Sequence, residues 1–327
     1  MSVLAKDNHG AKNRGERLVV VANPRSAGGR TGADRDRVER AVFRAFEQAE
    51  LCWTEGPGHA SELARLAASR ADIVAALGGD GTCHEVVNGL FSAGNAVNPK
   101  VIFTVLPSGT GGDLKRSLQI PARLEDSLWN AATGMTLPLD VGQVLWEDAP
   151  QKVFINVAGF GANAEVCRRA NQSSKRWGGQ ATFLGAIAQT LRDYRPQRLR
   201  WSWDTGTGVE EREVETLAAF CGNGHYCGAG LWVGREGSMA DGRFDLTLLP
   251  PVSLFQLPRM LPRAYNGTLG RSEGAVQRRV SWLRVHTPVF LELDGEPQRE
   301  APVELRVLPR ALQVRGGWLR PPANAPS

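Results

Sequence analysis

The stretch Ile73-Val74-Ala75-Ala76-Leu77-Gly78-Gly79-Asp80-Gly81-Thr82 decides the fold of this chain. Its first five residues are apolar and predict a buried strand, and the apolar spacing over 83–90 predicts a helix. Glycines between a strand and a helix let the backbone approach a ligand closely, and the free N–H groups at a helix N-terminus attract phosphate. The stretch therefore predicts a strand, a tight turn and a helix around a phosphorylated ligand.

Asp80 is the acidic residue inside this turn. Its carboxylate would repel a phosphate, so its position predicts Mg²⁺ between the two groups, bound directly or through water. When the turn is taken alone, a strand-to-helix crossover without a ligand is the alternative interpretation.

Two other strand-like runs, 18–22 and 101–105, also end in turn-forming residues. In a parallel sheet such ends share one edge, where open α/β folds bind their ligands. We therefore expect both loops to join the glycine turn in one nucleotide site. The candidates are Asn23 and Ser26 in the first loop and Gly109, Thr110 and Asp113 in the second.

The pattern of strands and helices changes near residue 139. Before it, strands alternate with helices, which predicts a parallel sheet covered on both faces. A helix is expected there over about 31–49 and a short strand over 51–54. After residue 139 most runs are β-like, which predicts a second, β-rich domain. The expected limits are 1–16 for a polar tail, 17–139 for the α/β domain, 140–310 for the β-rich domain and 311–327 for a C-terminal segment.

The composition predicts a water-soluble globular protein. Hydrophobic residues make up 42% of the chain and charged residues 22%, and no run of about 18 apolar residues predicts a transmembrane helix. The five cysteines lack the paired spacing of a zinc site. Because the first 16 residues have no apolar core of a signal peptide, we expect a cytoplasmic protein.

The net charge of +5 fits either nucleic acid or an anionic membrane as a partner. No nucleic-acid-binding motif is found, so we expect no nucleic-acid partner. Two segments mix basic with aromatic residues as interfacial surfaces do, although a buried strand and an amphipathic core helix would have the same pattern. They are 195–203, with Arg195, Arg198, Arg200, Trp201 and Trp203, and 255–265, with Phe255, Arg259, Arg263 and Tyr265.

Four motifs together resemble the diacylglycerol kinase catalytic-domain family, which also includes sphingosine and ceramide kinases and soluble bacterial lipid kinases. The resemblance extends over nearly the whole chain. The glycine-Asp-glycine turn alone is shared with NAD kinases and phosphofructokinases, whereas the last motif and Asp241-Gly242 favour the lipid kinases. Gly112 departs from the family's usual Asn, which removes a side-chain amide near the nucleotide. The motifs are Asn23-Pro24-x-Ser26, Gly78-Gly79-Asp80-Gly81-Thr82, Gly109-Thr110-x-x-Asp113 and Asp294-Gly295-Glu296.

The resemblance implies a Rossmann-like three-layer nucleotide-binding domain, of the phosphofructokinase and NAD kinase type, followed by a mostly β-sandwich domain. The active site would lie in the cleft between them, and the final segment would return to the first domain. Asp80 would act through a cation. Asp294 would be the general base that accepts the lipid hydroxyl proton, and Glu296 would help with the cation or orient that base. Taken alone, Asp294-Gly295 is an ordinary hairpin turn.

The resemblance also implies binding residues. For Asn23 and Ser26, ordering of their own loop by local hydrogen bonds is an equal alternative. The loop 238–245 resembles the family loop that binds a structural Mg²⁺, with the Asp241 side chain and backbone oxygens of Ser238 and Arg243 as ligands; a plain turn is the alternative. The expected nucleotide contacts are Asn23, Ser26, Thr54, Gly78, Gly79, Asp80, Gly81, Thr82, Gly109, Thr110 and Asp113.

We therefore expect an ATP- and Mg²⁺-dependent lipid kinase that docks peripherally on an anionic membrane, with diacylglycerol as the leading acceptor. A sphingoid base or ceramide is the next acceptor to consider. Two further interpretations stay open: a soluble-metabolite kinase of the NAD kinase type, and a catalytically silent lipid- or nucleotide-binding module. The sequence is also compatible with a homodimer.

Overall fold

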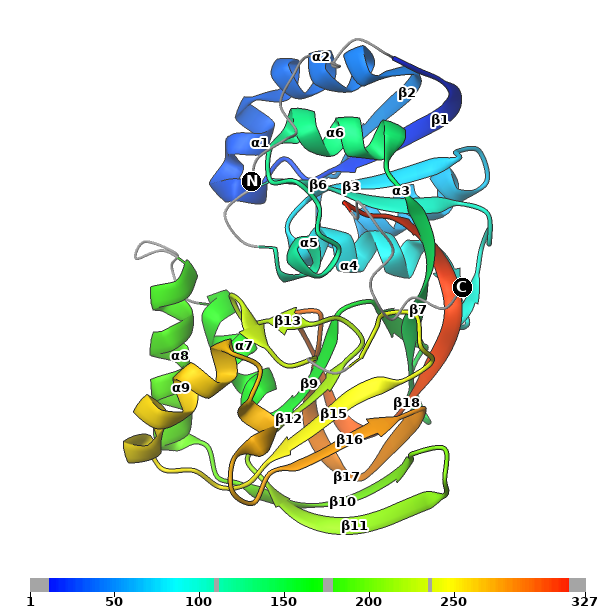
Figure 1. Ribbon diagram of the computed structural model, residues 1–327. Coiled ribbons are helices and arrows are strands. Elements are labelled where there is room, and N and C mark those ends of the chain that lie inside the picture. Colours follow the sequence, from blue (N-terminus) through cyan, green and yellow to red (C-terminus); the bar gives the residue numbers. More distant parts are fainter. Residues whose placement is uncertain (1–11, 109–111, 173–178, 235–236, 318–327) are drawn as a thin grey trace, which may run out of the picture.

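The computed structural model describes residues 12–108, 112–172, 179–234 and 237–317. The chain forms two halves, one rich in helices and one rich in strands (Figure 1). The helices are α1 (Arg30–Ala33), α2 (Arg35–Ala45), α3 (His59–Ala68), α4 (Asp80–Gly89), α5 (Asp113–Ser117), α6 (Leu124–Thr133), α7 (Ala162–Gln172), α8 (Gly179–Asp193) and α9 (Leu257–Tyr265).

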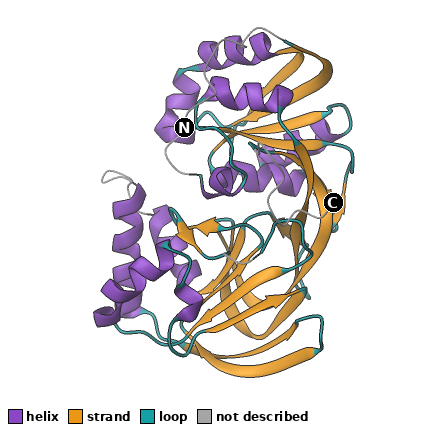
Figure 2. Cartoon of the chain, in the orientation of Figure 1, coloured by secondary structure: helices purple, strands orange, loops and turns teal. Residues whose placement is uncertain are grey.

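The N-terminal half is a parallel sheet between two helical layers (Figure 2). Side chains of β1 are buried on both faces of the sheet, and so are those of β3. Helices α3 and α4 cover one face, and α2 and α6 cover the other. This is the expected three-layer arrangement. Its strands are β1 (Asn13–Ala22), β2 (Phe46–Trp53), β3 (Ile73–Gly78) and β6 (Ile102–Pro107), with the short pair β4 (Phe91–Ser92) and β5 (Asn95–Ala96).

The helix expected over 31–49 is wrong in its second half. Helix α2 ends at Ala45, and β2 begins at the next residue. The segment that looks helical pairs in parallel with β1, from Arg17 opposite Gln48 to Ala22 opposite Trp53. Tertiary pairing at the sheet edge therefore overrides the local helix preference of this segment.

The C-terminal half is a mostly antiparallel β-sandwich around a core rich in large aromatic side chains. Phe154, Phe160, Trp201, Trp203 and Phe244 are fully buried there. Helices α7, α8 and α9 cover one outer side. The strands are β7 (Thr136–Leu145), β8 (Lys152–Phe154), β9 (Val157–Gly161), β10 (Gln197–Asp204), β11 (Val209–Thr216), β12 (Ala218–Gly222), β13 (Tyr226–Cys227), β14 (Leu231–Trp232), β15 (Phe244–Leu249), β16 (Val276–Val280), β17 (Trp282–Leu293) and β18 (Glu296–Arg315).

Strand β18 joins the two halves. It pairs with β17 and β7 in the sandwich, and its last residues pair with β6, where Gln313 lies opposite Ile102. The final part of the chain thus lies beside the parallel sheet of the N-terminal half. The domain limits expected at residues 139 and 310 stay predictions, because β7 continues through residue 139 and β18 continues through residue 310. No helix in the described ranges is long and apolar enough to cross a bilayer.

Candidate active site

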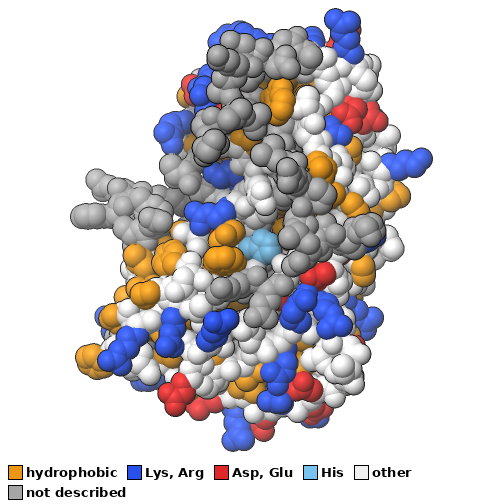
Figure 3. Space-filling view, viewed as in Figure 1, with side chains coloured by type: hydrophobic (Ala, Val, Ile, Leu, Met, Phe, Trp, Pro, Cys, Tyr) orange, Lys and Arg blue, Asp and Glu red, His pale blue; other side chains and the backbone are white. Residues whose placement is uncertain are grey.

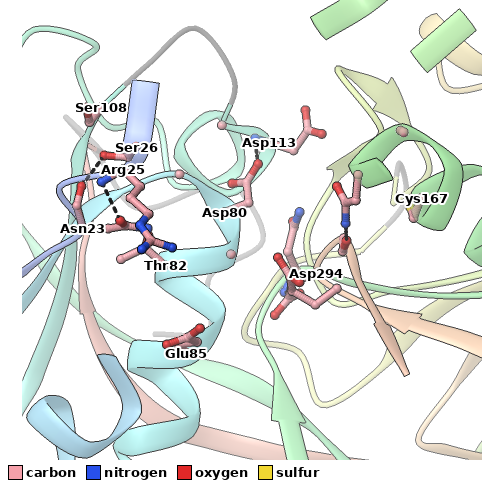
Figure 4. A pocket seen from close by; sticks show the side chains of 18 of the residues that line it. Asn23, Arg25, Ser26, Asp80, Thr82, Glu85, Ser108, Asp113, Cys167 and Asp294 are labelled. Atoms are coloured by element: carbon pink, nitrogen blue, oxygen red, sulfur yellow. Dashed lines mark hydrogen bonds between the residues drawn. The ribbon is translucent and has the colours of Figure 1, made fainter. Parts of the chain in front are cut away.

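A cleft of about 890 Å³ lies between the halves and is lined by residues of both. Loops after β1, β2 and β3 line its N-terminal side, with Asn23, Thr54 and Asp80 among the lining residues. The C-terminal side includes Asp294 and Glu296. Figure 4 shows Asp80 and Asp113 on one side of the cleft and Asp294 across from them.

The glycine turn brings the two sides into contact. Helix α4 begins at Asp80 with Gly79 as its N-cap, so its free N–H groups face the cleft. A Cβ on Gly81 would collide with Oε1 of Glu296, so a side chain there would displace Glu296. The N-terminus of α4 can therefore bind phosphate within reach of the Asp294–Glu296 turn.

The Asp80 carboxylate contacts the start of α5. Its oxygens accept hydrogen bonds from the backbone N–H groups of Asp113 and Leu114, at 3.2 and 3.3 Å. Burial raises the pKa of Asp80, and burial together with the charge of Asp80 raises the pKa of Asp113 to about 6. Lys115 and Arg116 act on these two carboxylates only through longer-range charge, and neither carboxylate forms an ion pair among the described residues, so the two acids fit Mg²⁺. Over the described ranges no group of three or more acidic, histidine or cysteine residues could chelate a metal by itself, so phosphate or water would complete the coordination.

Asp294 is held by four hydrogen-bond donors. Its Oδ1 accepts from the N–H groups of Asn156 and Val157, at 2.8 and 3.2 Å. Its Oδ2 accepts from the N–H of Ile155 at 3.2 Å and faces Nδ1 of His84 at 3.0 Å. The side chain is therefore buried and fixed in one orientation at the cleft wall.

The other predicted nucleotide residues fall into three groups. Asn23 donates from Nδ2 to Thr82 at 3.2 Å, and the hydroxyl of Ser26 donates to the carbonyl of Asn23 at 2.8 Å, so both order the loop beside the glycine turn. Thr54 is buried at the end of β2 and lines the cleft. Gly109 and Thr110 lie outside the described residues.

Gly112 has a conformational reason to be glycine. Its φ of 136° is in the region that favours glycine, and a Cβ there would press on the side chain of Lys115. The family's usual Asn would therefore be strained in this backbone conformation.

The loop proposed to bind a structural Mg²⁺ has a different cation beside it. Asp241 accepts hydrogen bonds from the N–H groups of Ser238 and Arg243 and forms an ion pair with Arg279. Arg279 also lies 3.5 Å from Asp245, its cross-strand neighbour. As it stands, the loop leaves the Asp241 oxygens occupied and does not fit a divalent cation. The metal-binding role of Ser238, Asp241 and Arg243 stays a prediction, with the guanidinium of Arg279 as its competitor.

Three residues of the site were not predicted from the sequence. His84 belongs to none of the four motifs, yet its ring contacts Asp294. Glu292 and Asn163 line the cleft and contact each other at 2.9 Å. The available signal for Glu292 was its position two residues before Asp294, at the end of β17, which ends at Leu293. No comparable signal exists for Asn163.

Comparisons with known proteins agree with this arrangement. The family model "Diacylglycerol kinase catalytic domain" matches residues 17–144, and "YegS C-terminal NAD kinase beta sandwich-like domain" matches residues 156–316. The "Probable lipid kinase YegS-like" proteins of Yersinia pestis (strain Pestoides F) and Yersinia pseudotuberculosis serotype O:1b (strain IP 31758) are both 28% identical over 277 residues, which is 81% of this chain and 85% of each relative.

The fold has a counterpart among solved structures. A diacylglycerol kinase from Bacillus anthracis str. Sterne superposes with a TM-score of 0.71 at 19% identity, covering 92% of this chain and 97% of the other. That likeness concerns the fold alone. The two family models match consecutive parts of the chain, which form the two sides of the cleft. The chain is therefore a lipid kinase and belongs to the diacylglycerol kinase catalytic-domain family.

Proposed function

We propose that this lipid kinase uses ATP and Mg²⁺ to phosphorylate the hydroxyl of diacylglycerol, giving phosphatidate. The observation that carries the proposal is the approach of the Asp294–Glu296 turn to the N-terminus of α4. His84 and Asp294 are 210 residues apart in the sequence and 3.0 Å apart in the structure. A phosphate-binding turn and a candidate base thus share one cleft, as phosphoryl transfer requires.

The nucleotide side of the cleft is built for phosphate. The N–H groups at the start of α4, including those of Gly81 and Thr82, would bind the phosphates of ATP. Asp80 would hold Mg²⁺ there, and the bound cation would spread the negative charge of the phosphates. The residue types and the raised pKa values of Asp80 and Asp113 support this assignment.

Asp294 would receive the proton of the acceptor hydroxyl. Its four donors fix the carboxylate, so its contribution would come from alignment and from late proton transfer. Glu296 lies against Gly81 and would help to align the turn with the phosphates.

The acceptor side of the cleft supports a lipid. Small or apolar side chains from α7, α8 and the segment 227–229 line it together with the polar Asn163 and Asn171, and its described lining includes no lysine or arginine. A phosphorylated soluble acceptor would need such a cation. An acyl chain, by contrast, would gain from burial against Phe183 and Ala170.

The segment 255–265 is the better of the two candidate membrane surfaces. In the segment 195–203, Trp201 and Trp203 are fully buried, and Arg198 and Arg200 pair with glutamates of β11. Phe255, in contrast, is 94% exposed beside α9. Figure 3 shows hydrophobic and basic side chains next to each other at the lower left, where Figure 1 places α8 and α9. This mixture suits an anionic bilayer, and α8 also lines the cleft through Thr182 and Phe183.

The reaction is tested by transfer of labelled γ-phosphate from ATP with Mg²⁺ to mixed micelles of diacylglycerol, ceramide or sphingosine, with NAD in parallel. We expect label in diacylglycerol and none without Mg²⁺. Label in ceramide or sphingosine alone would correct the acceptor, and label in NAD alone would overturn a lipid acceptor.

Membrane docking is tested by co-sedimentation with phosphatidylglycerol-containing and with purely zwitterionic vesicles at low and high salt. We expect binding to the anionic vesicles that weakens with salt and with Phe255→Glu. Val209→Glu, at another exposed apolar position, on β11, serves as the control and should bind as the wild type does. Equal binding by both variants would exclude this surface.

A further inference from the structure

Glu292 is a buried carboxyl at the cleft wall to which the proposed reaction gives no role. Glu292 is 1% exposed and lies on β17, two positions before Asp294. None of the ion pairs found among the described residues includes it, and its charged neighbours Asp294 and Glu296 are both acidic. A buried acid in such surroundings requires an explanation.

The carboxyl of Glu292 connects two elements of the site. Its Oε1 accepts a hydrogen bond from Nδ2 of Asn163 on α7 at 2.9 Å, and its Oε2 accepts one from the N–H of Gly295 at 2.7 Å. Gly159 lies opposite Glu292 on β9, and a Cβ there would collide with both Asn163 and Glu292. The sheet thus leaves room for this pair of side chains.

We propose that Glu292 is a positioning residue of the kinase reaction, a latch through which α7 holds the turn that carries Asp294 and Glu296. The inference rests on the proposed function, because Asp294 is the group that the latch keeps in place. Gly295 follows Asp294 directly, so the bond from its N–H to Glu292 restrains the backbone next to Asp294.

The latch is expected to work in its neutral form. Burial, with the charges of Asp294 and Glu296, raises the pKa of Glu292 to about 8. The titratable groups facing it from other elements are the thiols of Cys167 on α7 and Cys227 on β13, and burial raises the pKa of both well above the ordinary value. Near pH 7 the latch therefore adds no charge beside the triphosphate. Ionisation above about pH 8 would add a third negative charge at the turn.

The first test is the pH dependence of lipid phosphorylation by Glu292→Gln and Glu292→Ala. Gln keeps the shape and an acceptor for Gly295, so we expect a loss of about threefold at pH 7 from reorienting Asn163. We also expect Gln to abolish the alkaline decline that the wild type shows as pH rises through about 8. Ala removes both contacts and is expected to lower activity on the order of 10²-fold at every pH. Glu300→Gln, an exposed carboxylate on β18, is the matched control and should keep the wild-type profile.

The second test does not require catalysis. The folded pKa of Glu292 lies above its ordinary 4.5, so the contribution of this residue to stability is greatest at low pH and falls as pH rises from about 4.5 to about 8. Thermal unfolding of the nucleotide-free proteins measures this effect. We expect the Tm of Glu292→Gln minus the Tm of the wild type to increase by several degrees from pH 5 to pH 9.

The outcomes separate the two proposals. An alkaline decline that persists in Glu292→Gln, or a Gln variant as inactive as Ala, would overturn the latch. A Tm difference that does not change with pH would overturn its neutral state. A wild-type protein that labels no acceptor would instead overturn the proposed function, and the Tm measurement would still decide the protonation of Glu292.

Discussion

Nδ1 of His84 lies 3.0 Å from Oδ2 of Asp294, so the helix that follows the glycine turn contacts the candidate base directly. Both side chains are buried, at 8% and 4% exposure. The distance between the glycine turn and Asp294 is therefore set by a hydrogen bond between the two halves as well as by their packing.

Replacing Asp294 by Asn should remove proton transfer and leave the shape of the site nearly intact. We expect kcat to fall on the order of 10²- to 10⁴-fold while ATP still binds, because the phosphate-binding residues are on the other side of the cleft. Steady-state phosphorylation and titration with an ATP analogue measure the two quantities. Wild-type kcat in this variant would exclude Asp294 as the base.

His84→Ala should disturb the orientation of Asp294 and spare the nucleotide site. One of four donors is lost, so we expect kcat to fall about tenfold with little change in the KM for ATP. His286→Ala is the control, because His286 contacts Ser202 in the sandwich and does not line the cleft. Equal kcat values for the two variants would argue against a positioning role for His84.

Gly81→Ala should displace Glu296 from the start of α4. The added Cβ meets the end of a flexible side chain, so the protein should fold and lose activity on the order of 10²-fold through misalignment. Gly185→Ala on α8 is the control, because nothing lies within 4 Å of its Cβ. A Tm loss of many degrees in Gly81→Ala would instead indicate a structural role for this glycine.

Asp113→Asn should stabilise the nucleotide-free protein near neutral pH. Burial and the charge of Asp80 raise the pKa of Asp113 to about 6, above its ordinary 3.8. The contribution of Asp113 to stability therefore falls as pH rises from about 3.8 to about 6, whereas Asn does not titrate. Because Asp113 is partly exposed, we expect a gain below about 1 kcal/mol, or about 2–4 °C in Tm, at pH 7.5 and a smaller gain at pH 4.5. A gain that grows towards acid pH would contradict this assignment.

Arg279 should make the loop 237–243 independent of divalent cations. We expect the Tm of the nucleotide-free wild type to be the same in EDTA and in Mg²⁺, because the guanidinium balances Asp241. Arg279→Met should lower Tm and recover part of the loss with Mg²⁺, while Arg278→Met, at the neighbouring position, should not respond. A wild-type Tm that rises by several degrees with Mg²⁺ would support a cation on Asp241.

Local chemistry explains what could be predicted from the sequence alone. A strand, a glycine turn and a helix within 73–90 involve contacts between near neighbours, so this unit and the alternation around it identify the α/β class. The spaced motifs likewise identify the lipid kinase family. The end of α2 was missed because pairing of 46–53 with β1 depends on a partner about thirty residues away.

Only the tertiary structure decided which of the residues predicted from the sequence lie together in the site, and which residues that were not predicted join them there. Trp201 and Trp203 have an interfacial pattern, yet they lie in the sandwich core. Asp241 has a cation-binding pattern, yet Arg279 reaches it from a neighbouring strand. His84 gains its role from a contact with Asp294, which is far away in the sequence. Glu292 gains its role from a contact with Asn163, which lies on helix α7. Sequence determines local backbone preference, whereas the environment of a side chain depends on long-range packing, and it is this environment that sets orientation and protonation in the cleft.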